Sequence, residues 1–370
     1  DFLRELLDYS KVNYIGYSYG TWLGTWYADT YPDRVDRFVL DSNMNWVDDM
    51  QANADSDSHS FQRRRDAMLF PWIARHHDSY GLGTTADAVE QRYEEIRAKL
   101  VANTKAGLDT PYGYELDLAV LSPIYTDSGF PEAAEAIVAM GEVAFDEETS
   151  ATAERRIAAA TDGRALSPSA RLADARQQAE SGEEVIDLGS IGTVVRCNDT
   201  PYQTNPQPYL ARADRDTRKY SYIGYFNTVP MCAFWPYEQQ PRRIDLDNVP
   251  TMLMIQSEGD PATATEGAER SHRLTRKHTV MVGVVDEGQH GIYIGGPSAC
   301  IEQIGDAFVF GGVLPTTMTM CGTTPLPGDS TVHSLDGPFD KYQRRDRHTK
   351  PDRANPMLAR ARTQANQGMF

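Results

Sequence analysis

The chain has 370 residues, of which 40% are hydrophobic and 24% are charged. This length and composition predict a soluble globular protein with a sizeable core and exclude intrinsic disorder. Its apolar runs, such as residues 252–255, are far shorter than the roughly 20 residues that cross a bilayer. The net charge of -17 would repel nucleic-acid phosphates and anionic lipid surfaces, so neither is expected as a partner.

The first predicted elements form a strand, a helix and a second strand. Residues 1–9 have the apolar spacing of an amphipathic helix, and the first residue is Asp1 rather than methionine. No signal peptide is visible, so we expect that one has been removed or that the natural chain starts elsewhere. Residues 12–17 are rich in β-formers, residues 21–31 have helical spacing, and residues 37–41 are again a buried strand. This succession predicts a parallel βαβ unit.

A long helical block follows. Residues 47–248 contain helical stretches and few strand-like runs, which predicts an inserted cap or lid. Helices are expected over residues 86–104, 131–143 and 167–181. The first of them places Val89, Tyr93, Ile96 and Leu100 on one face.

The strand pattern returns at residues 251–257 and 279–285, with a helix between them over 262–275, and predicts a second βαβ unit. From about Gly337 the chain is polar and locally basic, which indicates a solvated or partner-docked tail. The predicted organisation is therefore a catalytic α/β core in two parts, 1–46 and 249–325, a cap over 47–248 and a tail over 326–370.

The cysteines are Cys197, Cys232, Cys300 and Cys321, with no C-x-x-C spacing and few histidines near them in sequence. A metal site is therefore not expected among them. We interpret them as two disulfides, Cys197 with Cys232 and Cys300 with Cys321, in a secreted protein. The alternative is four buried free thiols in a cytosolic protein.

Gly16-Tyr17-Ser18-Tyr19-Gly20 matches the pattern G-x-S-x-G. The pattern alone would arise by chance in about one chain of this length in ten, but here a buried strand leads in and a helix leads out. A nucleophile elbow requires that setting, because its sharp turn strains the serine and small residues let strand and helix approach closely. We predict that Ser18 is a nucleophile; the alternative is a serine that caps the helix.

A serine nucleophile needs a base to take its proton and a carboxylate to orient that base. Asp260 follows the predicted strand 251–257, and His290 lies five residues beyond the strand 279–285. Both are therefore expected on loops at the carboxyl edge of the sheet. The order Ser18, Asp260, His290 is that of α/β-hydrolases.

Other acids and histidines are weaker candidates. Asp41 also ends a predicted strand, although an aspartate there more often hydrogen-bonds locally, and Glu258 and Asp286 are less favoured. The adjacent pair His76 and His77 could suggest a metal, but neighbouring side chains on a helix diverge by about 100° and no third ligand is evident. We predict no metal and no cofactor.

These motifs resemble the secreted tripeptidyl aminopeptidases and proline iminopeptidase-like α/β-hydrolases of actinobacteria. The resemblance lies in the elbow at residues 13–21, in 31–35, in the acid loop 257–263 and in the histidine loop Gln289-His290-Gly291, where many relatives have glycine in place of Gln289. Cys300, Leu314-Pro315 and Cys321 resemble the closing segment of the family. The cap shows only scattered likeness.

The resemblance implies that Ser18 attacks a carbonyl carbon, that His290 acts as base and then acid, and that Asp260 holds the imidazole. It implies one oxyanion donor at the backbone N–H of Tyr19, while no glycine-rich loop for the second donor precedes Ser18. The family has an eight-stranded sheet, whereas we predict four strands, so the nucleophile strand would be an open edge. We therefore expect a separate N-terminal polypeptide segment, cleaved from a precursor or omitted from this sequence, that completes the sheet and the oxyanion hole.

The resemblance further implies a serine exopeptidase that releases tripeptides, N-terminal proline or other short peptides from peptide amino termini. Such an enzyme recognises the free α-ammonium group, for which we select Asp199 beside Cys197, and we select Phe234 and Trp235 for a side-chain pocket. A turn aspartate and cap core are the alternative interpretations of these residues. An esterase with the same triad and a non-catalytic binding module are the competing functions.

Overall fold

The computed structural model describes residues 1–104, 112–145, 188–226, 228–240 and 243–342. The chain divides into two compact units, Asp1–Ser60 with Gln240–Phe370, and Phe61–Gln239. Helix α3 (Met50–Arg64) passes from the first unit into the second. The predicted boundaries at residues 46 and 248 both fall within the segments of the first unit, and the predicted helix over 167–181 lies outside the described residues.

The first unit is built on a parallel sheet. Its described strands follow one another in the order β1-β2-β3-β4-β5, and every neighbouring pair is parallel. The four predicted strands are present, and a short fifth strand was not predicted. The strands are β1 (Val12–Ser18), β2 (Val35–Asn43), β3 (Met252–Ser257), β4 (Thr279–Val284) and β5 (Thr319–Cys321).

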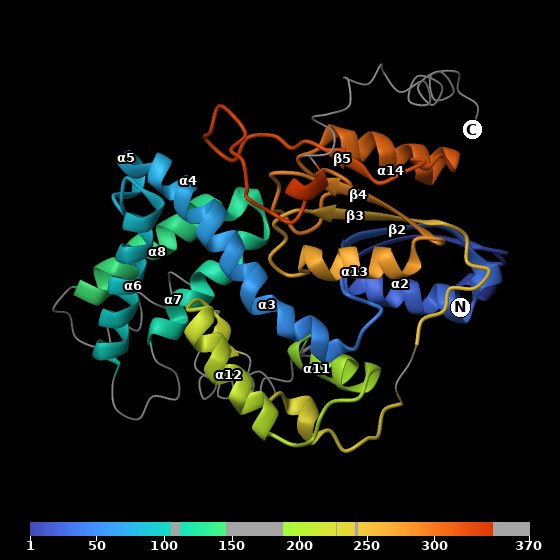
Figure 1. Ribbon diagram of the computed structural model, residues 1–370, viewed down its shortest axis with the longest axis horizontal. Coiled ribbons are helices and arrows are strands. Elements are labelled where there is room, and N and C mark those ends of the chain that lie inside the picture. Colours follow the sequence, from blue (N-terminus) through green and yellow to red (C-terminus); the bar gives the residue numbers. More distant parts are fainter. Residues whose placement is uncertain (105–111, 146–187, 227, 241–242, 343–370) are drawn as a thin grey trace, which may run out of the picture. The chain divides into compact units, whose positions relative to one another are not determined.

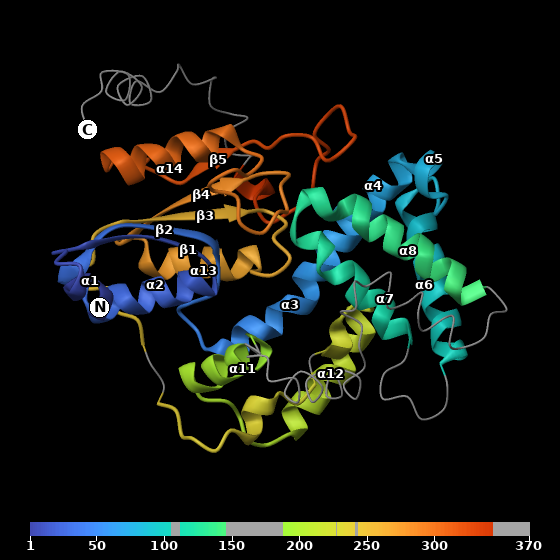
Figure 2. The same cartoon turned by 180° about the vertical axis from the view of Figure 1, so that it is seen from behind.

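Helices cover both faces of this sheet. Figures 1 and 2 show α2 (Tyr19–Thr30) and α13 (Thr265–Thr275) on one face and α14 (Ala299–Gly311) on the other. All six residues of β3 are buried, as expected for a central strand between two helical layers. On the α14 side the core joins the aliphatic residues of the central strands to those of the helix: Val39, Leu253, Ile255, Val282, Val284, Ile301, Ile304 and Phe308.

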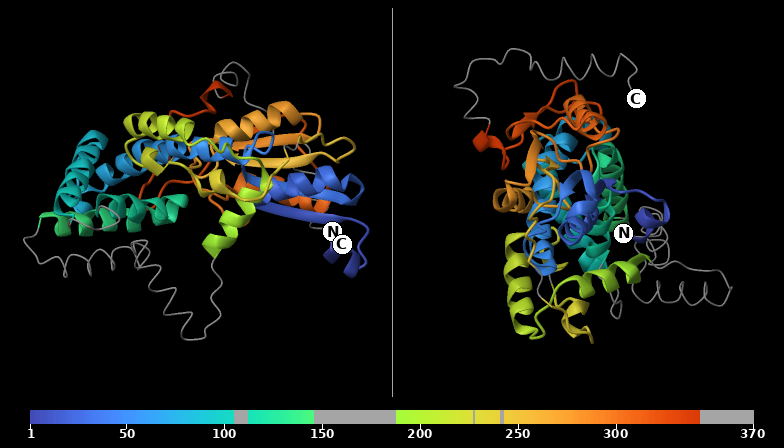
Figure 3. Two further views of the ribbon diagram at one scale, coloured as in Figure 1. Left: turned by 90° about the horizontal axis from the view of Figure 1, so that it is seen from below. Right: turned by 90° about the vertical axis from the view of Figure 1, so that its right-hand side faces the viewer.

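Within the described part of the sheet, β1 is an edge strand that pairs with β2. It is preceded by a short helix, α1 (Phe2–Leu6), drawn in dark blue at one end of the sheet in Figure 3. The side chains of Phe2, Leu3, Leu6 and Leu7 are 61% to 75% exposed. Among the described residues, the outer edge of β1 is therefore not paired with a strand, and the neighbouring helix α1 exposes apolar side chains.

The second unit is helical. In α6 the predicted face of Val89, Tyr93, Ile96 and Leu100 is buried, and the Thr85 hydroxyl caps the helix by accepting from the Ala88 amide. The helix predicted over 131–143 is α8. The longer described helices are α4 (Phe70–Arg75), α6 (Ala86–Asn103), α7 (Tyr112–Leu121), α8 (Phe130–Phe145), α11 (Leu188–Asp199) and α12 (Gln207–Lys219).

Both predicted disulfides are present. Cys197–Cys232 joins α11 to a 3-10 turn over Met231–Phe234, and Cys300–Cys321 joins α14 to β5. The Cα atoms of the pairs are 4.9 and 5.7 Å apart, within the usual range for disulfides. The helices that the structure describes include none with the length and apolarity needed to span a bilayer.

The described start of the predicted tail packs in the first unit. Leu335 and Phe339 are buried, and Phe339 lies against Gly283 of β4. Glu258 accepts from the Phe339 amide at 2.7 Å, and Asp286 accepts from the Leu335 amide at 2.8 Å. The stretch from about Gly337 was expected to be solvated or docked on a partner; in its described part, Phe339 is instead buried in the first unit. Residues 343–370 lie outside the described part.

Candidate active site

Ser18 ends β1 and directly precedes α2, in the strand-turn-helix setting that the sequence predicts. Its backbone has φ 55° and ψ -123°, a strained combination for a residue with a side chain. The Ser18 hydroxyl makes no capping hydrogen bond to the amides of α2, a helix that the structure describes throughout. The interpretation of Ser18 as a helix cap is therefore not supported, and the strained turn agrees with a nucleophile elbow.

The glycines of the motif allow the strand and the helix to touch. A Cβ atom on Gly16 would lie 2.5 Å from the carbonyl oxygen of Gly20, closer than van der Waals contact permits. The Tyr14 ring fills the remaining space, and its hydroxyl donates to the same Gly20 oxygen at 2.7 Å. The spacing of the motif is thus a packing requirement of the turn that presents Ser18.

Gly16→Ala should lower the free energy of unfolding by about 1–3 kcal/mol, the usual cost of overpacking, because backbone atoms cannot move aside as a flexible side chain can. Urea unfolding measures the change. Gly192→Ala is the matched control, since a Cβ atom there meets no atom within 4 Å and alanine favours the helix α11. Equal stability of wild type and Gly16→Ala would contradict the packing account.

Asp260 lies between β3 and α13 and is completely buried. Its Oδ1 accepts from the amides of Ala262 and Thr263, both at 2.9 Å, and its Oδ2 accepts from the Thr263 hydroxyl at 2.8 Å. Burial alone would raise the pKa of Asp260, but the charge and hydrogen bond of His290 and the bonds from Thr263 together hold it below its ordinary value. The carboxylate is therefore kept ionised and fixed in orientation.

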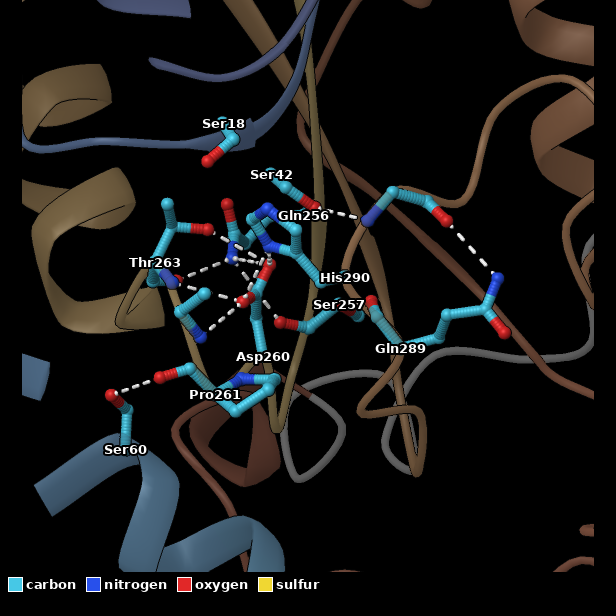
Figure 4. A network of polar contacts seen from close by, with 12 residues as sticks. Ser18, Ser42, Ser60, Gln256, Ser257, Asp260, Pro261, Thr263, Gln289 and His290 are labelled. Carbon is cyan, nitrogen blue, oxygen red and sulfur yellow. Dashed lines mark hydrogen bonds and ion pairs between the residues drawn. The ribbon is translucent and has the colours of Figure 1, made fainter. Parts of the chain in front are cut away.

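His290 lies on the loop after β4, and its side chain is nearly buried. Its Nδ1 is 3.0 Å from Oδ1 and 3.1 Å from Oδ2 of Asp260. Burial disfavours the imidazolium, yet the carboxylates of Asp260 and Asp41 outweigh it and raise the pKa of His290. Nδ1 is thus the ring nitrogen turned to Asp260, and Figure 4 shows Ser18 next to this cluster.

The residues next to Ser18 and His290 contact each other and bring the two segments together. Tyr17, the neighbour of Ser18, donates its hydroxyl to the carbonyl oxygen of Tyr293 at 2.9 Å. Its ring also lies against Gly291, the neighbour of His290. The structure thus unites the predicted nucleophile, base and acid at the carboxyl edge of the sheet.

The residues directly before His290 are held by hydrogen bonds to groups that were not selected from the sequence. The buried Glu287 accepts at Oε1 from the amides of Gly288 and Gln289, both at 2.7 Å. The Ser257 hydroxyl donates to the carbonyl oxygen of Gln289 at 2.5 Å (Figure 4). Polar residues at the ends of β3 and β4 were the available signal for both.

Asp41, the alternative acid, does not bind the imidazole as Asp260 does but binds backbone amides. It is fully buried, and its Oδ2 accepts from the backbone amides of Ile292 and Tyr293. Burial raises the pKa of Asp41 to about 7, with Asp260 adding to the rise and the two amides and His290 opposing it. Asp41 therefore holds the loop backbone, while Asp260 holds the imidazole.

Tyr19 is the first residue of α2, so its backbone amide lies at the N-terminus of that helix. It directly follows Ser18, which is where the sequence predicts an oxyanion donor. That role stays a prediction.

The predicted substrate residues belong to the second unit. Asp199 ends α11, the Phe234 side chain is 70% exposed, and Trp235 donates its ring N–H to Asn198 at 3.0 Å. The Cys197–Cys232 disulfide joins their segments, and their part in substrate binding stays a prediction. Among the described residues, no group of three or more His, Cys, Asp or Glu side chains is arranged to hold a metal ion.

Comparisons with known proteins agree with this architecture. A family model described as the alpha/beta hydrolase fold matches residues 1–111, and one described as TAP-like protein matches residues 221–321. The tripeptidyl aminopeptidases of Streptomyces lividans and Streptomyces coelicolor are 32% identical over 337 residues, or 88% of the chain. The serine protease Hip1 of Mycobacterium tuberculosis is 24% identical over 331 residues, 87% of the chain and 60% of that protein.

The chain spans only 58% and 57% of the length of the two Streptomyces relatives. The matched regions nevertheless include the elbow with Ser18 and the acid and histidine loops with Asp260 and His290. The parallel sheet with helices on both faces is the matching architecture. The chain therefore has the α/β-hydrolase fold and is similar to TAP-like proteins of that fold.

Proposed function

We propose that this chain carries the nucleophile, base and acid of a serine exopeptidase that releases tripeptides, N-terminal proline or other short peptides from peptide amino termini. The observation that carries the proposal is the strained Ser18 elbow beside a His290 whose Nδ1 is bound by the buried Asp260. The Streptomyces relatives are named tripeptidyl aminopeptidases, which supports the choice of substrate end.

In the proposed reaction Ser18 Oγ attacks the scissile carbonyl carbon while His290 Nε2 takes its proton. The same nitrogen then returns the proton to the leaving amine, and an acyl-enzyme on Ser18 remains for water to hydrolyse. Asp260 fixes the tautomer by accepting from Nδ1 and stabilises the imidazolium. The Tyr19 amide donates to the oxyanion of the tetrahedral intermediate.

We assign the recognition of the substrate's α-ammonium group and of its first side chains to residues of the second unit. Asp199 would bind the α-ammonium group, and Phe234 and Trp235 would line an apolar pocket. The partly buried Asp199 lies two residues from the disulfide-bonded Cys197, which supports a rigid carboxylate. The two disulfides also support a secreted protein, since disulfides persist in oxidising compartments.

We also propose that a polypeptide segment outside this chain pairs with β1 and supplies the second oxyanion donor. The edge position of β1 and the exposed apolar side chains of α1 support this, because an uncovered edge strand invites pairing. In this proposal the segment is released from a common precursor. Intact mass and N-terminal sequencing of the active enzyme test it, and one active species that starts at Asp1 with no accompanying peptide would refute it.

The substrate proposal is tested with matched tripeptide anilides that have a free or an N-acetylated amino terminus. An exopeptidase should lose at least about 100-fold in kcat/KM on acetylation, because the cationic group that fixes the cleavage register is gone. Equal rates on both would instead indicate an esterase or an endopeptidase. Failure of a serine-directed phosphonate to label Ser18, together with no hydrolysis, would indicate a non-catalytic binding module.

A further inference from the structure

The backbone directly behind His290 is held by two consecutive residues of β2. The Gly291 amide donates to Ser42 Oγ at 2.7 Å (Figure 4), and the next two amides, those of Ile292 and Tyr293, donate to Asp41 Oδ2 at 2.8 and 2.7 Å. Three successive backbone amides of the histidine loop thus donate to the side chains of Asp41 and Ser42, which lie about 250 residues away in sequence.

A β-bulge places this pair. In the pairing of β1 with β2, Tyr17 faces Asp41 and Ser18 faces Asn43, so Ser42 is an extra residue on β2. Its φ is 57°, in the left-handed region that few residues with side chains adopt, and it is fully buried. Bulges beside active sites redirect side chains, and this one lies opposite the step from Tyr17 to Ser18.

The bulge is held in place by Asn43. The Asn43 side-chain Nδ2 donates to the carbonyl oxygens of Leu40 and Ile255, each at 2.9 Å. The Asn43 backbone N–H donates to Oε1 of Gln256 at 2.7 Å. A strained residue persists only where its surroundings determine its conformation, as they do here. The position of Ser42 is therefore built into the junction of β1, β2 and β3.

We propose that Asp41 and Ser42 are positioning residues that hold the backbone behind His290 from the β2 bulge and thereby keep its imidazole aimed at Ser18. The inference rests on the proposed function and assigns to Asp41 a role apart from that of Asp260. Asp260 orients the ring about its Nδ1, whereas Asp41 and Ser42 fix the loop that carries the ring.

Asp41 also acts on the charge of the imidazole. The titratable groups that face Asp41 are Asp260 from the β3 loop, His290 from the β4 loop and Tyr17 from β1. An ionised Asp41 favours the imidazolium and so raises the pKa of His290. Removing that charge without removing the acceptor should lower the pKa of His290.

Asp41→Asn and Asp41→Ala separate the two effects. A single oxygen of Asp41 accepts both amides, so the carbonyl oxygen of asparagine can replace it, whereas alanine cannot. In the full-length protein, Asp41→Ala should lower kcat about 100-fold with little change in KM, the usual result of a misplaced catalytic group. Asp41→Asn should keep kcat within about tenfold and move the acid limb of the kcat/KM profile to lower pH.

Ser42→Gly and Ser42→Ala form a second pair. Both remove the hydroxyl that accepts from Gly291 and should lower kcat about fivefold, the rate equivalent of one net hydrogen bond. Glycine adopts φ 57° without the strain that a Cβ atom causes in alanine, so Ser42→Gly should have the higher Tm of the two. Equal loss of kcat at unequal Tm separates positioning from stability, and it remains measurable if Asp41→Ala fails to fold.

The titration of His290, followed by NMR of ring-labelled histidine without substrate, gives a readout independent of activity. A lower pKa of His290 in Asp41→Asn than in wild type supports the inference. Wild-type kcat and an unchanged pH profile in Asp41→Ala, Asp41→Asn and both Ser42 variants would overturn it. If wild type neither cleaves peptides nor reacts with a phosphonate at Ser18, the proposed function fails, while the NMR comparison still decides whether Asp41 acts on His290.

Discussion

Ser18→Ala should lower kcat on a tripeptide anilide by at least about 10⁴-fold, with KM and the free energy of unfolding nearly unchanged. The variant removes the attacking oxygen and the proton that His290 would take, so no acyl-enzyme can form. It keeps the strained backbone of φ 55° and ψ -123°, which the packing of Gly16 against Gly20 imposes on either side chain. Steady-state hydrolysis and urea unfolding measure the two quantities.

Ser334→Ala is the matched control for this variant, because Ser334 is an exposed serine of the same unit. It should retain wild-type kcat, since exposed substitutions away from a site rarely change stability by more than about 0.5 kcal/mol. Residual activity above one part in a hundred in Ser18→Ala, after contaminating peptidase is excluded, would remove Ser18 from the mechanism.

Asp260→Asn should lower kcat by about 10³–10⁴-fold. The carboxylate accepts from His290 Nδ1, and the amide that replaces it can donate to that nitrogen instead. The ring would then carry its proton on Nε2, where it cannot take the proton of Ser18. Asp41→Asn is the matched control, because it changes another buried aspartate beside His290 and should retain kcat within about tenfold. A larger loss in Asp41→Asn than in Asp260→Asn would make Asp41 the catalytic acid.

The two carboxylates should also give opposite pH dependences of stability. The pKa of Asp260 is lowered, so its contribution is fully present above its unfolded pKa of about 3.9 and is lost as pH falls through the folded value. The pKa of Asp41 is raised to about 7, so its contribution is fully present below its unfolded pKa and is lost as pH rises toward 7. Urea unfolding of wild type and both asparagine variants from pH 3 to pH 8 measures these slopes, and identical slopes in all three proteins would contradict the assignment.

The sequence predicts those parts of the site that depend on local pattern. Glycines two residues either side of Ser18 mark the elbow because strand and helix touch there. Asp260 and His290 were found because each follows a buried strand, and the carboxyl ends of parallel strands meet at one edge of the sheet. The buried face of α6 and both disulfide pairs were predicted correctly.

Features that depend on pairing between distant segments could not be predicted. The bulge at Ser42 arises from the register of β1 against β2, which no local pattern records. Strand β5 has only three residues, too few to show a period. Asp41 and Asp260 share the same signal, an aspartate at a strand end, and only the three-dimensional structure shows that one meets backbone amides and the other the imidazole.

The most direct test of the account is to label the full-length protein with a peptidyl phosphonate and locate the adduct by tandem mass spectrometry. One adduct is expected, on Ser18. It should be absent in Ser18→Ala and form at least about 100-fold more slowly in His290→Ala, because the base that activates the hydroxyl is gone. An adduct on another residue, or undiminished labelling in His290→Ala, would contradict the claim that His290 activates Ser18.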